Sequence, residues 1–526
     1  MTRGPVINMR KWFYQIRSQG LFNFLCGVGN EIQPPKAKPK SKISASLTKN
    51  VVLMQERLKG TSDFNVRELE IGGVKVNIFT NEGMTNIQTV NDSLIRLTES
   101  FKERDDATGE EIYQFIETKM LFAAEMKDIY TFEDLFKMMM SGFLIVLIDG
   151  VDHAISMGAQ GFQFRSISEP SGEINIRGSR EGFTEPIKIN MSMIRRRVKS
   201  EALHFEMLKV GNTGQTDVCL AYLDDVASPK LLKNIKYQLS KIDFSLILNS
   251  GYIQPFLESV QGSFFSDVGY TERPDTVCAK IYEGRVAVLV DGTPFALIVP
   301  YLFSENFQSI DDYNHKPYYA TAVRFLKYIS FAVTILLPGL YVAIGTFHPE
   351  LFPPALLFNI VSSQETTPFP MVIEALVIHF IYEVMREAGL RLPRPVGHAI
   401  SIVGSLVIGD AAVTAGLIGS PMVMVVALTA ISSFVVPSLQ EPAAVLKFGF
   451  IIIGGTMGLY GIALGAAVVL VNASALTAFG VPYLSPIAPF SLYAMRDTFV
   501  RSGIKTLQKK DNQVDELNGI HIGRQD

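Results

Sequence analysis

The 526-residue chain has few of the residues and motifs on which catalytic and disulfide-rich proteins depend. Its three cysteines, Cys26, Cys219 and Cys278, lie too far apart in the sequence for a disulfide framework or a thiolate metal site. The sequence contains no phosphate-cradling glycine loop, no zinc-protease histidine pair and no nucleophile elbow. We therefore predict that the protein has no cofactor, no metal and no enzymatic activity.

Charge is scarce in the last third of the chain. Only 13 of the 99 charged residues fall between residues 323 and 495. Uncharged runs extend over 20 residues from Tyr328 to Phe347, 29 from Ala411 to Leu439 and 48 from Phe448 to Met495. About 20 apolar residues suffice to cross a bilayer, and a helix satisfies its own backbone in lipid. The sequence therefore predicts an all-α, polytopic membrane domain.

Four to five spans fit this domain. They are Tyr328–Phe347, Met371–Met385, Gly397–Leu417, Met422–Val436 and Phe448–Val471. Residues 346–370 contain no Lys or Arg, whereas three arginines follow the second span, so the part before residue 323 is predicted to be cytoplasmic. Five spans place the carboxyl end outside, but the basic tail after residue 495 favours the inside. The side of the carboxyl end stays open at this point.

A repeat with an offset of 142 residues extends between residues 74 and 299. Residues 142–154 align with residues 284–296, and six of the thirteen aligned positions are identical. In both copies two apolar runs surround an Asp-Gly pair, at Asp149 and at Asp291, which is the pattern of a β-hairpin. We predict two similar α/β subdomains in tandem, and we interpret the two aspartates as turn residues and not as catalytic carboxylates.

These patterns divide the chain into five parts. They are a basic leader and linker at 1–47, an α/β subdomain at 48–175, a second α/β subdomain with an interfacial linker at 176–322, the helical membrane domain at 323–495 and a basic polar tail at 496–526. The leader lacks the uninterrupted apolar run of a signal peptide. We therefore expect the α/β subdomains to stay in the cytoplasm.

Arginines cluster between the two copies of the repeat. The cluster comprises Arg177, Arg180, Arg195, Arg196 and Arg197, with Glu181 among them. Arginine forks bind phosphate or carboxylate, so an anion or nucleic-acid site is one interpretation. No basic field surrounds the cluster, and Glu169, Glu173, Glu181 and Glu185 offer partners for ion pairs. We therefore expect a structural salt-bridge network and no nucleic-acid partner.

Polar residues inside the predicted spans are candidate functional groups, because each is costly in hydrocarbon. His379, Glu383 and Arg386 follow the i, i+4, i+7 spacing and share one face of the second span, with Glu374 on the opposite face. This stripe either conducts or senses ions, or its charged members extend towards the cytoplasmic interface. Both interpretations stay open.

The third span carries a stripe of small residues with an acid beside it. The stripe comprises Gly397, Ser401, Ser405, Gly409, Ala412 and Gly416, and Asp410 adjoins it. Small residues allow close helix packing, but a helix with this face can also line a narrow aqueous path, where Asp410 attracts cations. Pore-lining candidates are therefore Ser401, Ser405, Gly409 and Asp410, with His379 and Glu383 behind them. Gly454, Gly458, Gly461 and Gly465 in the fifth span are interpreted as packing residues.

Nine short motifs in this order resemble the A subunits of spore germinant receptors, the GerA family. They are Glu169–Pro170, RGSREGF from 177, Ile194–Arg197, TERPD from 271 with Arg273 and Asp275, LVDGTP from 289, TFHPE from 346, RLPRPVG from 391, SIVG from 401 and PYLSP from 482. The resemblance covers residues 160–490. The sequence departs from the family pattern at Ser179, where proline is expected, and at Asp410, where glutamine is expected.

The resemblance implies a multi-pass protein of the spore inner membrane. It implies a homo-oligomeric ring, such as a pentamer, that forms a nutrient-gated ion channel together with a permease-like B subunit and a lipoprotein C subunit. The arginine motifs, including Arg273 and Asp275, are then family motifs of assembly or structure. The related stage V sporulation AF protein shares the motifs, so a receptor subunit and an accessory channel are both compatible with them. A secondary transporter and a non-conducting membrane scaffold are the alternative functions. The sequence identifies neither the germinant nor the ion.

Overall fold

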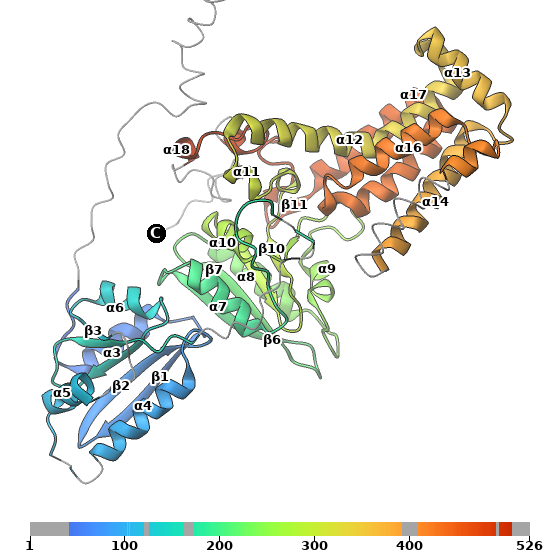
Figure 1. Ribbon diagram of the computed structural model, residues 1–526. Helices are drawn as coiled ribbons and strands as arrows, with labels where there is room; N and C mark the ends of the chain where they lie inside the picture. Colours follow the sequence, from blue (N-terminus) through green and yellow to red (C-terminus); the bar gives the residue numbers. More distant parts are fainter. Residues whose placement is uncertain are drawn as a thin grey trace, which may run out of the picture.

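The computed structural model describes residues 41–101, 104, 106–119, 126–161, 170, 172–173, 175–391, 409–490 and 494–507. These residues form two α/β subdomains, which we call the arm, and a helical region that follows them (Figure 1). Most of the predicted leader and of the predicted tail lies outside the described residues.

The first subdomain is an antiparallel sheet between two layers of helices. Its strands are β1 (Phe64–Ile71), β2 (Val74–Asn81), β3 (Met126–Ile129), β4 (Leu144–Ile148) and β5 (Ala154–Met157), in the order β1-β2-β4-β5-β3. Helices α3 (Leu47–Arg57) and α6 (Phe132–Met139) pack on one face, and α4 (Ile87–Ser100) and α5 (Gly109–Lys119) pack on the other. Because helices cover both faces, β4 is apolar and buried at every position.

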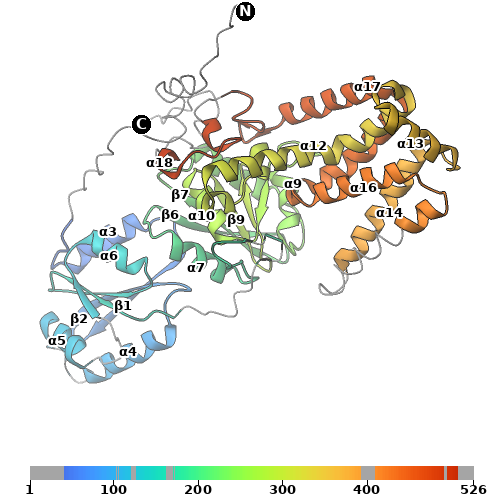
Figure 2. The same ribbon diagram turned by 45° about the horizontal axis from the view of Figure 1, so that its top comes forward.

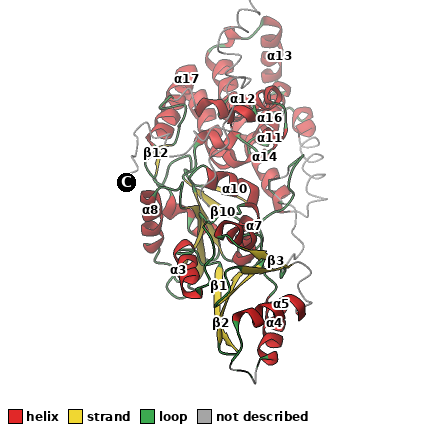
Figure 3. Ribbon diagram, turned by 90° about the vertical axis from the view of Figure 1, so that its left-hand side faces the viewer, coloured by secondary structure: helices red, strands yellow, loops and turns green. Residues whose placement is uncertain are grey.

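The second subdomain repeats this arrangement. Its strands are β6 (Leu203–Val210), β7 (Thr216–Leu223), β8 (Gly269–Thr271), β9 (Val286–Val290) and β10 (Ala296–Val299), in the order β6-β7-β9-β10-β8. Helices α7 (Ile187–Arg197) and α10 (Pro274–Tyr282) cover one face; α8 (Pro229–Ser240) and α9 (Gln254–Leu257), which follows η1 (Ser250–Tyr252), cover the other. The two sheets appear as yellow strands in Figure 3. The identical strand order confirms the tandem α/β arrangement that the repeat predicts.

The Asp-Gly pairs have the same role in both copies. Asp149 and Asp291 each follow the first strand of a hairpin, β4–β5 and β9–β10. The Asp149 carboxylate also accepts a hydrogen bond from the Leu47 amide at the start of α3, and Asp291 accepts one from the Ile187 amide at the start of α7, each at 3.0 Å. A carboxylate at a helix start satisfies an otherwise unpaired N–H and interacts favourably with the helix dipole. Each hairpin is thereby bound to the first helix of its own copy.

The helical region begins after β10. Its elements are η2 (Phe303–Phe307), α11 (Asp311–Asn314), α12 (Pro317–Phe347), η3 (Pro349–Leu351), α13 (Pro354–Glu365), α14 (Met371–Arg391), α16 (Ser420–Ser433), η4 (Pro437–Leu439), α17 (Gln440–Ala475), β11 (Thr477–Ala478), β12 (Val481–Pro482), η5 (Ala494–Asp497) and α18 (Ile504–Leu507). Helices α12, α14, α16 and α17 pack together at one end of the molecule (Figure 1).

Within the described residues, two helical stretches are long and apolar enough to cross a membrane. They are Pro317–Phe347 and Pro437–Ala475, and the shorter apolar helix α16 accompanies them. Helix α14 has 21 residues and covers the second predicted span. Most of the third predicted span, with Ser401 and Ser405, lies outside the described residues.

Helix α17 reverses direction at Gly458, whose φ of 61° and ψ of −149° are not helical. A Cβ placed on Gly465 would lie 3.0 Å from the Phe450 ring, and one on Gly461 would lie 2.6 Å from Cγ2 of Ile453. In a straight helix, residues 450 and 465 would be about 22 Å apart. Residues 440–457 and 459–475 therefore form an antiparallel hairpin. The prediction of one continuous span from Phe448 to Val471 is wrong, because a glycine with positive φ turns the chain back.

The first half of α17 lies directly against α12, and Figure 2 shows the two helices side by side. A Cβ on Gly339 would lie 2.5 Å from the Phe450 carbonyl oxygen, and one on Gly454 would lie 2.5 Å from the Gly339 carbonyl oxygen. Only residues without a side chain allow this approach of two backbones. The interpretation of these glycines as packing residues therefore agrees with the structure for Gly454, whereas Gly458 forms the turn.

The end of α17 and the chain that follows it return to the arm and to the start of the helical region. The Asn472 side-chain oxygen accepts a hydrogen bond from the Ser263 hydroxyl at 3.0 Å, and residues 494–507 contact α11 and α12. Both ends of the helical region therefore lie next to the arm.

Candidate functional site

Three charged side chains form a cluster between α14 and α17, in which Lys447 is buried and Glu383 and Arg386 are partly buried. Glu383 binds Lys447 at 2.7 Å and Arg386 at 2.7 Å through its two carboxylate oxygens. Lys447 is 3% exposed, and its ammonium lies 5.5 Å from the centre of the Tyr382 ring. A charge in an apolar helix bundle is costly unless an opposite charge accompanies it. The cluster therefore binds the two helices to each other and carries an excess of one positive charge.

His379 lies one turn from Glu383 on the same face of α14. It is 1% exposed, and neither ring nitrogen has a hydrogen-bond partner among the described residues. The predicted stripe thus faces α17 within the single chain, with His379 buried and Glu383 bound to Lys447. Glu374, on the other face, accepts a hydrogen bond from the Gly419 amide at 2.5 Å and joins the starts of α14 and α16.

Asp410 is placed differently from these inward-facing groups. Its side chain is exposed, and among the described residues it has no ion-pair partner. The neighbouring Gly409 is buried, and a Cβ there would lie 3.6 Å from Cγ1 of Val423 in α16. Of the pore-lining candidates on the third predicted span, Ser401 and Ser405 lie outside the described residues.

The arginine motifs of the arm form two ion-pair groups. Glu181 accepts hydrogen bonds from Arg196 at 2.6 Å and from Arg197. Burial raises the pKa of Glu181, but the two arginines outweigh it and the net shift is downward. Arg273 binds the Asp275 carboxylate at 2.6 Å and the Ser179 carbonyl at 2.7 Å. These contacts are what the interpretation as a salt-bridge network predicts.

Arg177 and Arg180, by contrast, have exposed side chains. The Arg177 backbone is nevertheless held, because its N–H donates to the Asp311 carboxylate at 3.3 Å and its carbonyl accepts from the Asn314 side-chain NH₂ at 2.5 Å. Asp311 is the first residue of α11 and Asn314 is the last. The first arginine of the RGSREGF motif therefore joins the arm to the helical region.

Arg195 joins the two subdomains. Its guanidinium binds both carboxylate oxygens of Asp63, at 2.8 and 3.1 Å, and donates to the Leu203 carbonyl at 2.8 Å. It lies between the rings of Phe64 and Phe205, at 5.3 and 4.9 Å, and is 0% exposed. The sequence points to Arg195 through its motif but gives no sign of Asp63, which is 132 residues away.

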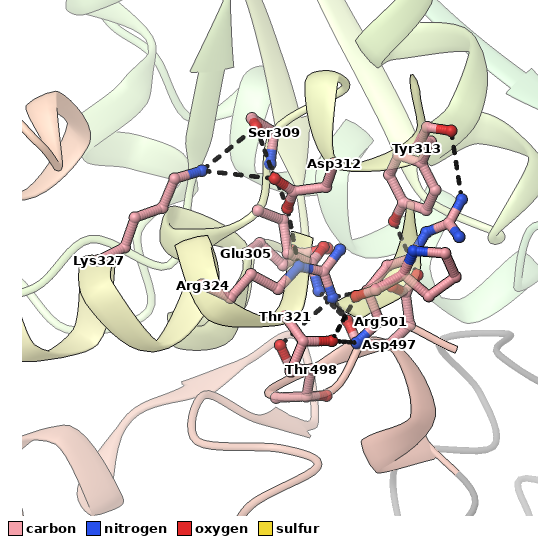
Figure 4. A network of polar contacts seen from close by, with 12 residues as sticks. Glu305, Ser309, Asp312, Tyr313, Thr321, Arg324, Lys327, Asp497, Thr498 and Arg501 are labelled. Carbon is pink, nitrogen blue, oxygen red and sulfur yellow. Dashed lines mark hydrogen bonds and ion pairs between the residues drawn. The ribbon is translucent and has the colours of Figure 1, made fainter. Parts of the chain in front are cut away.

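A second buried network lies at the start of α12 (Figure 4). Arg324 is 0% exposed; it binds Asp312 of α11 at 2.7 Å and Asp497 at 2.9 Å. The Tyr313 hydroxyl donates to the other Asp497 oxygen at 2.7 Å. Burial raises the pKa of Asp497, against the opposing effect of Arg324. Three segments, α11, α12 and η5, therefore meet at one carboxylate.

Glu305 of η2 connects this network to the arm. Its buried carboxylate binds Lys280 of α10 at 2.5 Å and Arg285, next to β9, at 2.7 Å. It also accepts a hydrogen bond from the Leu302 amide at 2.8 Å. Burial raises the pKa of Glu305, but Arg285 and Lys280 outweigh this effect and the net shift is downward.

Comparison with known proteins identifies the class of the protein. The family model "Bacillus/Clostridium GerA spore germination protein" matches residues 52–513, which include both the tandem α/β arm and the apolar helical region. The chain belongs to the GerA family. This confirms the resemblance carried by the nine motifs.

Its relatives are similar along most of their length. Spore germination protein KA of Bacillus subtilis is 40% identical over 487 residues, covering 92% of this chain and 89% of that protein. Spore germination protein GerLA of Bacillus cereus is 33% identical over 452 residues, covering 85% and 91%. The crystal structure of the N-terminal domain of the A subunit of the Bacillus megaterium germinant receptor GerK3 is 30% identical, covers 51% of this chain and 99% of that chain, and gives a TM-score of 0.40.

Proposed function

We propose that this protein is the A-type membrane subunit of a nutrient germinant receptor in the spore inner membrane, and that it assembles into a ring around a gated cation path. The two relatives described above bear the names of spore germination proteins. The permease-like B subunit and the lipoprotein C subunit are the proposed partners, and the arm lies in the cytoplasm.

The exposed carboxylate of Asp410 carries the proposal of an ion path. Glu383 pairs with both Arg386 and Lys447 inside the chain, whereas Asp410 has no ion-pair partner among the described residues. An ionised carboxylate facing acyl chains is costly, so its favourable surroundings are water or another subunit. In a ring of subunits, the third span with Ser401, Ser405, Gly409 and Asp410 lines the path, and His379 and Glu383 stand behind it.

Removing this charge tests the ion path. Asp410→Asn should lower cation flux through the reconstituted receptor about fivefold, since one charge about 4 Å away stabilises a cation by about 1 kcal/mol in water. The measurement is the current, or the release of K⁺ and Na⁺, in proteoliposomes. Glu387→Gln, which removes an exposed carboxylate paired with Arg391, is the matched control. Unchanged currents in Asp410→Asn would remove Asp410 from the path.

The hairpin in α17 makes a prediction about topology. Since the two halves of α17 run in opposite directions, we propose an even number of crossings, with residues 494–507 on the same side as the arm. Ile504 and Tyr237 are both exposed, and Tyr460 is exposed next to the turn. Cysteines at 504 and 237 should react with a membrane-impermeant maleimide from one side, and a cysteine at 460 from the other. Labelling of 504 and 237 from opposite sides would contradict the hairpin topology.

A further inference from the structure

The segment 494–507 crosses the start of α12 and is bound there by backbone and side-chain contacts. The Asp497 carbonyl accepts hydrogen bonds from Arg324 and from the Gln308 side chain, each at 2.7 Å. Four residues further on, the Arg501 amide donates to the Thr321 hydroxyl at 3.1 Å, and its guanidinium donates to the Tyr313 carbonyl at 3.2 Å. The segment therefore contacts α11, α12 and the residue that follows η2 at once.

Aromatic contacts continue the same attachment. The Phe499 ring lies 4.6 Å from the ring of Tyr328 and 6.1 Å from that of Phe325, both on α12. Thr498, Arg501 and Ser502 are at most 2% exposed. These three side chains of the last described part of the chain are thus buried, and 173 residues separate Asp497 from its partner Arg324.

The contacts form a continuous connection from the arm to α12. Lys280 and Arg285 belong to the arm and hold Glu305 of η2. The chain then continues to Asp312 in α11, whose carboxylate binds Arg324 of α12 at 2.7 Å and the Ser309 hydroxyl at 3.0 Å. Asp497 closes this connection from the other side, because Arg324 and Tyr313 both bind its carboxylate (Figure 4).

We propose that residues 494–507 form a clasp that transmits displacement of the arm to α12, with Asp497 as its positioning residue. Arg324 and Asp312 are buried, and opening the contacts of Arg324 would leave an uncompensated charge. The clasp therefore stays closed when the arm is displaced, and α11, α12 and residues 494–507 move together. Without it, α12 keeps its chain connection through α11 and the ring contacts of Phe307 with Tyr328 and Phe331, but it loses the polar contacts that hold Arg324 from the other side. The consequence for ion release rests on the proposed function; the mechanical role of the clasp does not.

Distance measurement tests the mechanical role. Spin labels at Tyr237→Cys in α8 and Phe358→Cys in α13, both exposed positions, report the arm relative to the helical region in full-length protein with Cys26→Ser in nanodiscs. Cys219 and Cys278 are buried. Asp497→Ala should broaden the distance distribution, Asp497→Asn should broaden it less, and Glu387→Gln should leave it unchanged.

A disulfide that replaces the clasp contacts tests whether the clasp couples movement of the arm to ion release. In Asp497→Ala spores, release of K⁺ after addition of a mixture of amino acids and sugars should fall about tenfold or more, which corresponds to a free-energy change of about 1.4 kcal/mol or more. Adding Thr321→Cys and Arg501→Cys, whose parent residues are in hydrogen-bond contact, allows a disulfide to close the clasp again. Oxidation should narrow the distance distribution and restore release, and reduction should reverse both.

The outcomes separate the clasp from the receptor function. A narrow distribution in Asp497→Ala overturns the proposal, and so does a broad distribution with undiminished ion release. Failure of the oxidised cysteine pair to restore either quantity also overturns it, because loss of local folding then explains the variant. If distances respond as expected and wild-type protein releases no ions, the clasp stands and the proposed function falls.

Discussion

Arg195→Ala should destabilise the arm by about 3–5 kcal/mol, the usual cost of removing one partner of a buried ion pair. The substitution leaves the Asp63 carboxylate, which is 1% exposed, without its bidentate partner. It also leaves the Leu203 and Ser200 carbonyls without the donors that now lie 2.8 and 3.0 Å away. Because these acceptors belong to both subdomains, we expect the subdomains to separate before either sheet unfolds. Denaturant unfolding and proteolysis between residues 162 and 186 would measure this.

Three variants distinguish charge from packing at this position. Arg67→Ala removes an exposed arginine from β1 and should change stability by less than about 0.5 kcal/mol. Arg195→Lys keeps the charge but loses the planar fork, and should fall between wild type and alanine. The double variant Arg195→Met with Asp63→Leu should be more stable than Arg195→Ala, since no buried charge stays unpaired. Equal stability of Arg195→Ala and Arg67→Ala would show that the pair contributes nothing.

Gly454→Val should separate α17 from α12 and cost about 3 kcal/mol, the upper part of the range for overpacking. Even a Cβ at this position would lie 2.5 Å from the Gly339 carbonyl oxygen, which belongs to a helix backbone and cannot rotate away. The nearby Glu383–Lys447 pair should loosen as well, because Lys447 belongs to the same half of α17. Thermal unfolding and size-exclusion profiles of the purified protein in detergent would record the effect.

The same helix offers a matched control. Gly449 lies five residues before Gly454, and a Cβ there would meet no atom within 4 Å. Gly449→Val should therefore stay within about 1 kcal/mol of wild type, because only the intrinsic helix propensity changes. If both valine variants behaved alike, the contact between α12 and α17 would not depend on glycine.

The fold of the arm could be predicted from the sequence because each copy of the repeat has recognisable apolar runs and an Asp-Gly turn. The apolar runs around Asp149 and Asp291 indicate two buried hairpins, and the offset between them predicts two copies of one fold. The hydrogen bond that each aspartate accepts from the first helix of its copy was not predictable, since it joins positions about 100 residues apart. Local sequence determines the strands, whereas such long-range contacts need the folded chain.

The apolar composition of the sequence predicts a helical region, but it does not predict where the chain turns between helices. Gly454, Gly458 and Gly461 follow one another at intervals of three or four residues, as glycines on one helix face do. The sequence alone therefore does not distinguish a packing glycine from Gly458, which turns the chain. Lys447 was missed as the partner of Glu383 because it precedes the uncharged run and resembles an interfacial anchor. Asp497 was missed because it lies in the predicted tail, where a charge is unremarkable in sequence.

The bond from each hairpin aspartate to the first helix of its copy also bears on how the arm arose. Asn50 binds the Ser44 backbone amide and carbonyl at 3.0 and 2.6 Å, and Asn190 binds those of Thr184 at 2.8 and 2.6 Å, so the two helix starts match as well. The hairpin and the first helix of each unit are thus joined to each other within that unit, in addition to the contacts such as Arg195–Asp63 that join the two units. A module closed in this way is complete before it is copied, as expected of an ancestral gene segment that folded alone and was then doubled.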